Sequence, residues 1–141
     1  MTDVDLDLVN DDDKQGPFVQ HIGLTFSEVA ADRVVATWTA GPRHHQPFGI
    51  VHGGVHASVV ETLGSIGSNV WLEERKAEAH AVGVNNSTDF FRAVREGDLV
   101  STATAVHQGR SQQVWVVETC DDEGRLVTRG QLRTQNVYRD A

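Results

Sequence analysis

Residues 46–71 read QPFGIVHGGVHASVVETLGSIGSNVW, and this stretch decides the fold. From Val55 to about Trp71 the apolar residues recur at spacings of one, three and four, which predicts one long, mostly buried helix. The preceding residues, from Gly41 to Gly54, contain prolines and several glycines and are predicted to be irregular. The stretch therefore predicts a loop that leads directly into a core helix.

Strand-like segments lie on both sides of this helix in the sequence. Before it, residues 21–30 and 33–40 are rich in β-branched and aromatic residues, and Ala31-Asp32 between them suits a hairpin turn. After it, four strands and two turns are predicted: strands at about 79–91, 97–107, 112–120 and 125–137, and turns at 109–111 and 121–124. This order predicts an α+β domain in which one antiparallel sheet packs against one long central helix.

The composition fits one globular domain. The chain has 141 residues, of which 39% are hydrophobic and 23% are charged, and this length is usual for a single domain. The net charge is -8, and an acidic stretch runs from Asp3 to Asp13. We expect residues 1–16 to form a solvated, flexible acidic arm, and residues 17–141, after the Gly16-Pro17 break, to form the domain.

Several classes of protein are excluded by composition. No apolar run approaches the roughly 18 residues of a membrane span, and no basic cluster indicates a nucleic-acid surface. The N-terminus lacks the features of a secretory signal, so we expect a cytoplasmic protein. The single cysteine, Cys120, cannot form an internal disulfide. No metal site is expected, because carboxylates or cysteines at ligand spacing are absent around the remaining histidines, His21, His44, His45 and His80.

The start of the predicted helix is a candidate binding site. Gly53 and Gly54 have no side chains, so a ligand can approach their backbone N–H groups closely. The first N–H groups of a helix have no partner inside it and lie at the positive end of its dipole. They can hold a phosphate or a developing oxyanion. A plain turn is the alternative interpretation of His52-Gly53-Gly54.

Glu61 is the candidate catalytic residue. It lies among Val59, Val60 and Leu63 on a helix that is too apolar to be freely exposed. A buried carboxylate is costly, so a partner or a function is expected for it. Ser65 lies four residues further on, on the same face of the helix. The alternative is that both residues form the polar edge of an amphipathic helix.

Helix geometry separates the two candidates. Gly53 and Glu61 are eight residues apart, which corresponds to about 12 Å along the helix axis and a rotation of about 80°. One chain cannot bring both groups to one small reacting group. If both act on one carbonyl, a second subunit must supply one of them, which predicts a two-fold dimer with its sites at the interface.

The sequence resembles the hotdog-fold thioesterases of the 4-hydroxybenzoyl-CoA and 1,4-dihydroxy-2-naphthoyl-CoA type, and those of phenylacetate pathways are near relatives. The similarity covers about residues 18–137. The loop and the helix carry it first, through Gln46-Pro47-Phe48-Gly49, His52-Gly53-Gly54 and Glu61-Thr62-Leu63-Gly64-Ser65. It continues through Val82-Gly83, Phe91-Arg92, Glu96-Gly97, His107-Gln108-Gly109-Arg110, Gln113-Val114-Trp115 and Asp122-Glu123-Gly124-Arg125-Leu126.

The resemblance implies a role for each residue of the catalytic motif. The Gly53 N–H polarises the thioester carbonyl, and Gln46 assists. His52 shapes the loop and contacts the thioester sulfur. Glu61 of the neighbouring subunit attacks the carbonyl or activates a water, and Ser65 orients the carboxylate or the water.

The resemblance also implies a site for CoA, which is part of the substrate. No other cofactor and no metal is implied, and the expected assembly is a homodimer or homotetramer. Arg92 and Arg110 are natural phosphate partners, although ordinary exposed strand and turn residues are the alternative. The implied CoA-contacting residues are Gly83, Phe90, Phe91, Arg92, Ala93, His107, Gln108, Gly109, Arg110, Ser111 and Gln112.

Two positions depart from the family pattern. Phe90 stands where similar members often have a histidine, which leaves the acyl specificity open. His56 stands where small residues are usual, and we favour a packed or surface histidine over a catalytic one.

Hydrolysis of an aromatic acyl-CoA is the predicted function, with 1,4-dihydroxy-2-naphthoyl-CoA as the single best substrate. A proofreading thioesterase for medium-chain acyl-CoA or acyl-carrier-protein esters is a second hypothesis. A non-catalytic acyl-CoA binding protein is a third hypothesis, from another class. The joint presence of Glu61, Gln46 and His52 argues against it, because a binding protein needs none of the three.

Overall fold

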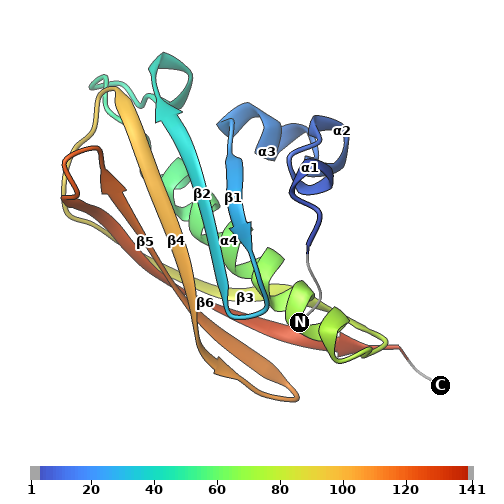
Figure 1. Ribbon diagram of the computed structural model, residues 1–141. Helices are drawn as coiled ribbons and strands as arrows, with labels where there is room; N and C mark the ends of the chain where they lie inside the picture. Colours follow the sequence, from blue (N-terminus) through green and yellow to red (C-terminus); the bar gives the residue numbers. More distant parts are fainter. Residues whose placement is uncertain (1–3, 140–141) are drawn as a thin grey trace.

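A single long helix lies against a curved antiparallel sheet in the computed structural model of the protein, which describes residues 4–139 (Figure 1). The predicted core helix is present and extends three residues further than expected. The elements in chain order are α1 (Leu6–Val9), α2 (Asp12–Gln15), α3 (Pro17–Ile22), β1 (Thr25–Val29), β2 (Arg33–Ala40), the 3-10 helix η1 (Pro42–His44), α4 (Gly53–Glu74), β3 (Ala79–Phe90), β4 (Gly97–Gln108), β5 (Gln112–Asp121) and β6 (Leu126–Tyr138).

The six strands form one sheet in the order β1-β2-β4-β5-β6-β3. Every neighbouring pair is antiparallel, and the four strands predicted after the helix agree with β3 to β6 within one residue at each end. β3 follows α4 directly and lies at one edge of the sheet, where it pairs with β6. This arrangement is the predicted hotdog fold, in which the sheet wraps around the central helix.

The helix α4 lies close to the sheet because two of its core-facing residues are glycines. Val59, Val60 and Leu63 of α4 are fully buried. A Cβ at Gly64 would lie 2.5 Å from Leu132, and one at Gly67 would lie 2.7 Å from ring atoms of Trp115. The sheet therefore touches the bare helix backbone, and this contact sets the depth at which α4 is buried. Among residues 4–139, none of the helices combines the length and the apolar content that a membrane crossing requires.

The first strand is shorter than predicted. Residues 21 and 22, which we expected in a strand, end helix α3, and β1 begins at Thr25. Gly23 is the physical reason, since it takes the left-handed conformation (φ 81°) and its N–H donates to the Val19 carbonyl oxygen at 3.2 Å. A glycine in this conformation is a common helix end.

The acidic N-terminal segment is helical where the structure describes it, and residues 1–3 lie outside the described part. Two short helices, α1 and α2, are capped by the Asp5 and Asp11 side chains. Asn10 joins the segment to β1: its Nδ2 donates to Phe26 O at 2.9 Å and its Oδ1 accepts from Phe26 N at 2.6 Å. The acidic pattern predicted a solvated arm, but the apolar residues between the acids, Val4, Leu6 and Val9, pack against the core.

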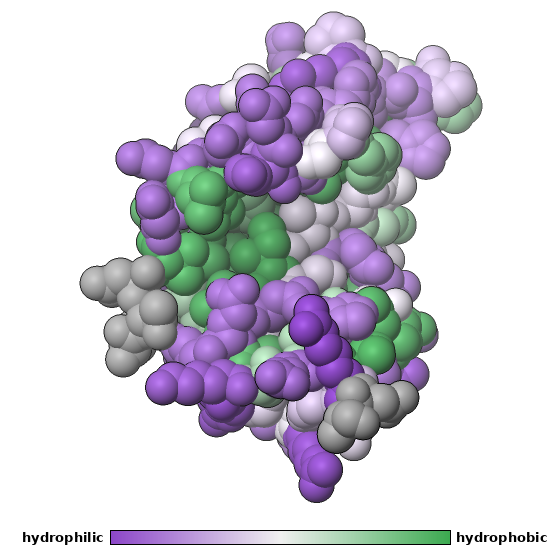
Figure 2. Space-filling model, turned by 90° about the vertical axis from the view of Figure 1, so that its right-hand side faces the viewer, coloured by the Kyte–Doolittle hydropathy of each residue, from purple (hydrophilic) through white to green (hydrophobic). Residues whose placement is uncertain are grey.

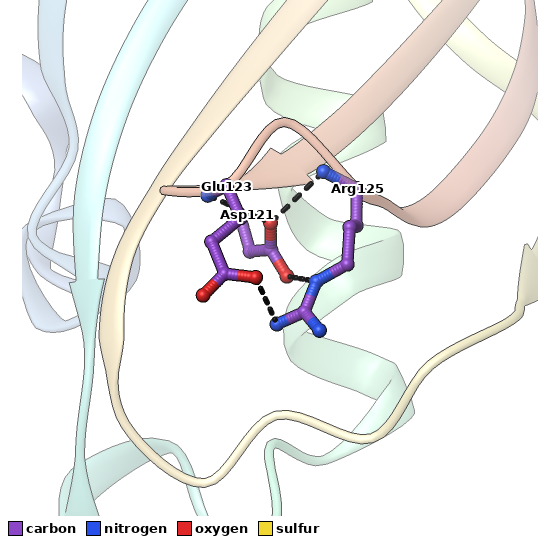
Figure 3. Close-up of polar contacts among 3 residues, drawn as sticks. All are labelled: Asp121, Glu123 and Arg125. Carbon is purple, nitrogen blue, oxygen red and sulfur yellow. Dashed lines mark hydrogen bonds and ion pairs between the residues drawn. The ribbon is translucent and has the colours of Figure 1, made fainter.

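The turn between β5 and β6 lies where it was predicted. Asp121 Oδ1 accepts from the backbone N–H of Glu123 at 3.0 Å and from that of Arg125 at 2.9 Å (Figure 3). Arg125 Nε pairs with Asp121 Oδ2 at 2.8 Å, and its second guanidinium nitrogen lies 3.4 Å from Glu123 Oε2. Arg125 is thus paired with carboxylates of its own turn, and its role is to stabilise the β5–β6 hairpin.

Candidate active site

The start of α4 is held by His52. His52 is the N-cap residue of the helix, and its Nδ1 accepts a hydrogen bond from the Gly54 N–H at 2.8 Å. Because Nδ1 is the acceptor, the proton of the neutral ring is on Nε2. Gly53 is the first residue of the helix, so its N–H has no acceptor inside the helix. The loop therefore presents the Gly53 N–H at the positive end of the helix dipole.

A cavity of about 320 Å³ opens beside this helix start, and we name it the Gly53 cavity. It brings together six of the predicted site residues from the loop, the helix and the end of β3. Gln46 is oriented there, because its Oε1 accepts from the Phe48 N–H, and this leaves the amide NH₂ group as the free donor. The cavity is lined by Gln46, Ile50, Val51, Gly53, His56, Phe90, Phe91, Arg92, Ala93 and Val94.

His56 also belongs to this cavity, which sequence reasoning missed. Of the packed and surface positions expected for His56, the structure shows the packed one: His56 is only 4% exposed and lies edge-on to Trp38, with ring centroids 5.6 Å apart. Its Nδ1 is buried without a hydrogen-bond partner among the described residues. Burial lowers the pKa of His56 from 6.5 to about 4, and the charge of His44 acts in the same direction. The imidazole is therefore neutral near pH 7.

Glu61 lines a different cavity, of about 430 Å³, which we name the Glu61 cavity. Ser65 lies in the same cavity, one helical turn after Glu61, as predicted. Glu61 Oε2 is buried and has no hydrogen-bond partner among the described residues. The N-terminal segment forms part of the wall, which the expectation of a solvated arm could not foresee. The lining residues are Val9, Lys14, Gln15, Val19, Phe26, Glu61, Thr62, Ser65 and Ile66.

This second cavity belongs to a largely apolar side of the molecule. A further hollow, of about 470 Å³, lies between α1 and the later turns of α4. It adjoins the Glu61 cavity, because Val9, Ser65 and Ile66 line both. Figure 2 shows hydrophobic side chains gathered in a hollow on one face of the molecule, with polar side chains around it. Gly53 and Glu61 thus lie in separate surroundings, as the helix geometry predicted.

The predicted CoA-contacting residues fall into three places. Phe90 to Ala93 line the Gly53 cavity. Gly83 lies instead against the Glu61 carboxylate. The third group, residues 107–112, surrounds the turn between β4 and β5. In this group Gln108 Nε2 donates to Ala31 O at 2.6 Å and Gln112 Nε2 donates to Gln135 Oε1 at 3.1 Å, so both amides serve the fold.

Arg92 and Arg110 lie near opposite ends of the sheet. Phe90, two residues before Arg92, pairs with Thr128 of β6, whereas the Tyr138 hydroxyl at the other end of β6 donates to Arg110 O at 2.6 Å. From Thr128 to Tyr138 the strand advances ten residue positions, which is about 33 Å at about 3.3 Å per residue. No group of three or more histidine, cysteine, aspartate or glutamate side chains within residues 4–139 is placed to hold a metal ion.

Comparison with known proteins agrees with this geometry. The family model of the thioesterase superfamily matches residues 48–128. The crystal structure of AziG from S. sahachiroi has a TM-score of 0.85 and 48% identity, covering 89% of this chain and 100% of that chain. Proofreading thioesterase EntH from Cronobacter sakazakii is 34% identical over 84% of this chain and 85% of its own length. The 1,4-dihydroxy-2-naphthoyl-CoA hydrolase of Escherichia coli is 31% identical over 85% of this chain and 86% of its own length.

The chain therefore belongs to the thioesterase superfamily. It is a hydrolase with the hotdog fold, acting on thioesters of the acyl-CoA kind. The family, the fold and the reaction class predicted from the motifs are confirmed.

Proposed function

We propose that the protein hydrolyses the thioester of an aromatic acyl-CoA and that Glu61 is its catalytic carboxylate. The observation that carries this proposal is the buried Glu61 Oε2, which has no hydrogen-bond partner within residues 4–139 and adjoins a mostly apolar cavity. Burying a carboxylate oxygen without a hydrogen-bond partner costs folding free energy, so we expect a function that requires it. The carboxylate is free either to attack the thioester carbonyl carbon or to take a proton from an attacking water.

The Gly53 cavity supplies the groups that stabilise the reacting carbonyl. The Gly53 N–H and the Gln46 amide both line it as hydrogen-bond donors. Two fixed donors stabilise the negative charge that develops on the carbonyl oxygen when the carbon is attacked. His52 keeps the helix start in place through its bond to the Gly54 N–H.

A second copy of the chain completes the site in this proposal. Both half-sites adjoin β3, since Phe90 lies against Gly53 and Gly83 lies against Glu61. β3 is an edge strand, and its Val82 and Val84 are exposed. An open apolar edge favours pairing with another strand. Antiparallel pairing of two β3 strands brings the Gly83 part of one chain toward the Phe90 part of the other, so each site combines two chains.

The same pairing explains how two distant arginines serve one CoA. Within one chain Arg92 and Arg110 are near opposite ends of the sheet. A two-fold axis through the β3 edge reverses the second sheet, and Arg110 of the partner subunit then lies at the end where Arg92 lies. In a protein of net charge -8, a polyanionic ligand needs such local positive charge. We assign both arginines to the phosphate groups of CoA.

An aromatic acyl group fits the Gly53 cavity because three aromatic rings line it. Phe90, Phe91 and His56 supply them, and rings favour stacked or edge-on contacts with other rings. The similarity to a 1,4-dihydroxy-2-naphthoyl-CoA hydrolase supports this class of substrate. The similarity to a proofreading thioesterase supports a second candidate, the removal of misloaded acyl groups from a carrier protein.

A hydrolysis screen tests the proposal. Wild-type protein and Glu61→Gln are assayed on aryl, short-chain and long-chain acyl-CoA esters and on an acylated carrier protein. We expect aryl-CoA esters to have the highest kcat/KM, and Glu61→Gln to lower kcat at least about a hundredfold while the protein stays folded. A Glu61→Gln protein with more than about a tenth of wild-type turnover contradicts the role of Glu61. A preference for the carrier protein supports the second candidate.

A further inference from the structure

Gly83 of β3 lies directly against the carboxylate of Glu61. A Cβ added at Gly83 would lie 2.9 Å from both Cδ and Oε2 of Glu61 and closer still to Oε1. Real Cβ atoms do not come this close to other atoms. The carboxylate therefore occupies space that is available only because residue 83 has no side chain.

The backbone at Gly83 is held against α4 on both sides. Before it, the Ala81 N–H donates to Asn69 Oδ1 at 2.9 Å. After it, Asn86 Nδ2 donates to Ala57 O at 2.9 Å. Between these two bonds the pairing of β3 with β6 shifts register at Gly83 and Asn85, so the strand has a bulge beside Glu61. Bulges re-aim the backbone and are frequent next to active sites.

We propose that Gly83 is a positioning residue for the catalytic carboxylate. The bare backbone of the bulge forms one wall of the space around Glu61 and leaves room for the carboxylate in its observed position. This inference rests on the proposed role of Glu61 in thioester hydrolysis. The role of Gly83 would then be to position Glu61, and not to contact CoA as the family resemblance implies.

Gly83 of β3, which contacts α4, and Gly67 of α4 itself allow a matched comparison of alanine substitutions. At Gly83 the added methyl group meets the far end of a flexible side chain, so the carboxylate can move aside at little cost to folding. At Gly67 the methyl group meets the ring of Trp115, which is fully buried and cannot move freely. Gly83→Ala should therefore affect catalysis, and Gly67→Ala should affect stability.

The experiment measures kcat, KM and the melting temperature for both variants. Gly41→Ala is the control, because nothing lies within 4 Å of a Cβ there. For Gly83→Ala we expect kcat to fall by about tenfold or more, with KM within about twofold and the melting temperature close to wild type, because displacement of a catalytic group by about 1 Å has effects of this size. Gly67→Ala should melt at a lower temperature, and Gly41→Ala should match wild type.

A double variant separates positioning from a general structural role. In the Glu61→Gln background the carboxylate is absent, so adding Gly83→Ala should leave the residual rate within about twofold of Glu61→Gln alone. An equal loss in both backgrounds overturns the proposal, as does full activity or failure to fold of Gly83→Ala. If Glu61→Gln is itself active, the proposed function fails, whatever Gly83→Ala does.

Discussion

The two cavities along α4 differ in the chemistry they can supply. The Gly53 cavity is lined by backbone and amide hydrogen-bond donors and by aromatic rings, whereas the Glu61 cavity places a carboxylate beside a largely apolar surface. In the proposed function the Gly53 cavity stabilises the oxyanion and the Glu61 cavity delivers the nucleophile or the base. One helix thus carries both halves of the proposed reaction, and two chains together are needed to combine them.

The largest expected effect is the recovery of activity when two inactive variants are mixed, which tests whether the two cavities combine across two chains. Glu61→Gln and Gly53→Pro should each be at least about a hundredfold less active, since proline removes the N–H that we propose as the oxyanion donor. A mixture that has exchanged subunits should regain up to about a quarter of wild-type activity. Half of its dimers are mixed at equal ratio, and each of these has one intact site of two.

The control for this experiment is Gly53→Ala, which adds a Cβ near Phe90 but keeps the N–H. Gly53 is the first residue of α4, where proline is tolerated, and each variant must be shown to fold and dimerise. A mixture that stays as inactive as its parents after verified exchange means that one chain contains the whole site.

Gln46→Ala tests the hydrogen-bond donors of the Gly53 cavity. The Gln46 amide is the second donor of the Gly53 cavity, so its loss should lower kcat by about tenfold to a hundredfold with a smaller change in KM. Gln131→Ala, an exposed glutamine of β6, is the matched control. A larger effect on KM than on kcat would show that Gln46 binds the ground state instead.

Arg92→Ala and Arg110→Ala should each raise KM by about tenfold at low ionic strength, because each removes one of the charge-assisted bonds that we propose to the CoA phosphates. The effect should become smaller as salt is added. Arg33→Ala is the control, since Arg33 pairs with Glu28 at 2.9 Å in the β1–β2 hairpin. Unchanged KM in both variants at low salt would remove these arginines from the CoA site.

His56 gives a prediction about stability, with no effect expected on the rate at neutral pH. Burial lowers the pKa of His56 to about 4 from 6.5, so the unfolded chain binds the proton more readily. The stability due to the neutral ring is present above about pH 6.5 and is lost as the pH falls toward 4, by up to about 3 kcal/mol. Denaturant unfolding of His56→Phe should show a smaller loss over this range. The exposed His80 serves as control, and His80→Gln should behave as wild type.

The periodic parts of the fold could be predicted, because burial on one side leaves a repeat in the sequence. Val59, Val60 and Leu63 recur as a buried helix requires, and strands β3 to β6 were found with their turns. The N-terminal segment was predicted less well. Its acids suggested a solvated arm, yet Val4, Leu6 and Val9 pack on the core, because a few apolar contacts are enough to fasten a short segment.

The sequence alone determined the helix, the glycine pair at its start and a carboxylate on an apolar face. From these it follows that Gly53 and Glu61 of one chain cannot reach the same small group, because rise and rotation along a helix are constant. Only the tertiary structure decided what surrounds each group. His56 lines the Gly53 cavity, the N-terminal segment walls the Glu61 cavity, and Gly83 touches the Glu61 carboxylate. Such contacts join residues that are distant in the chain, and their geometry depends on the twist and bulges of the sheet, which no local pattern records.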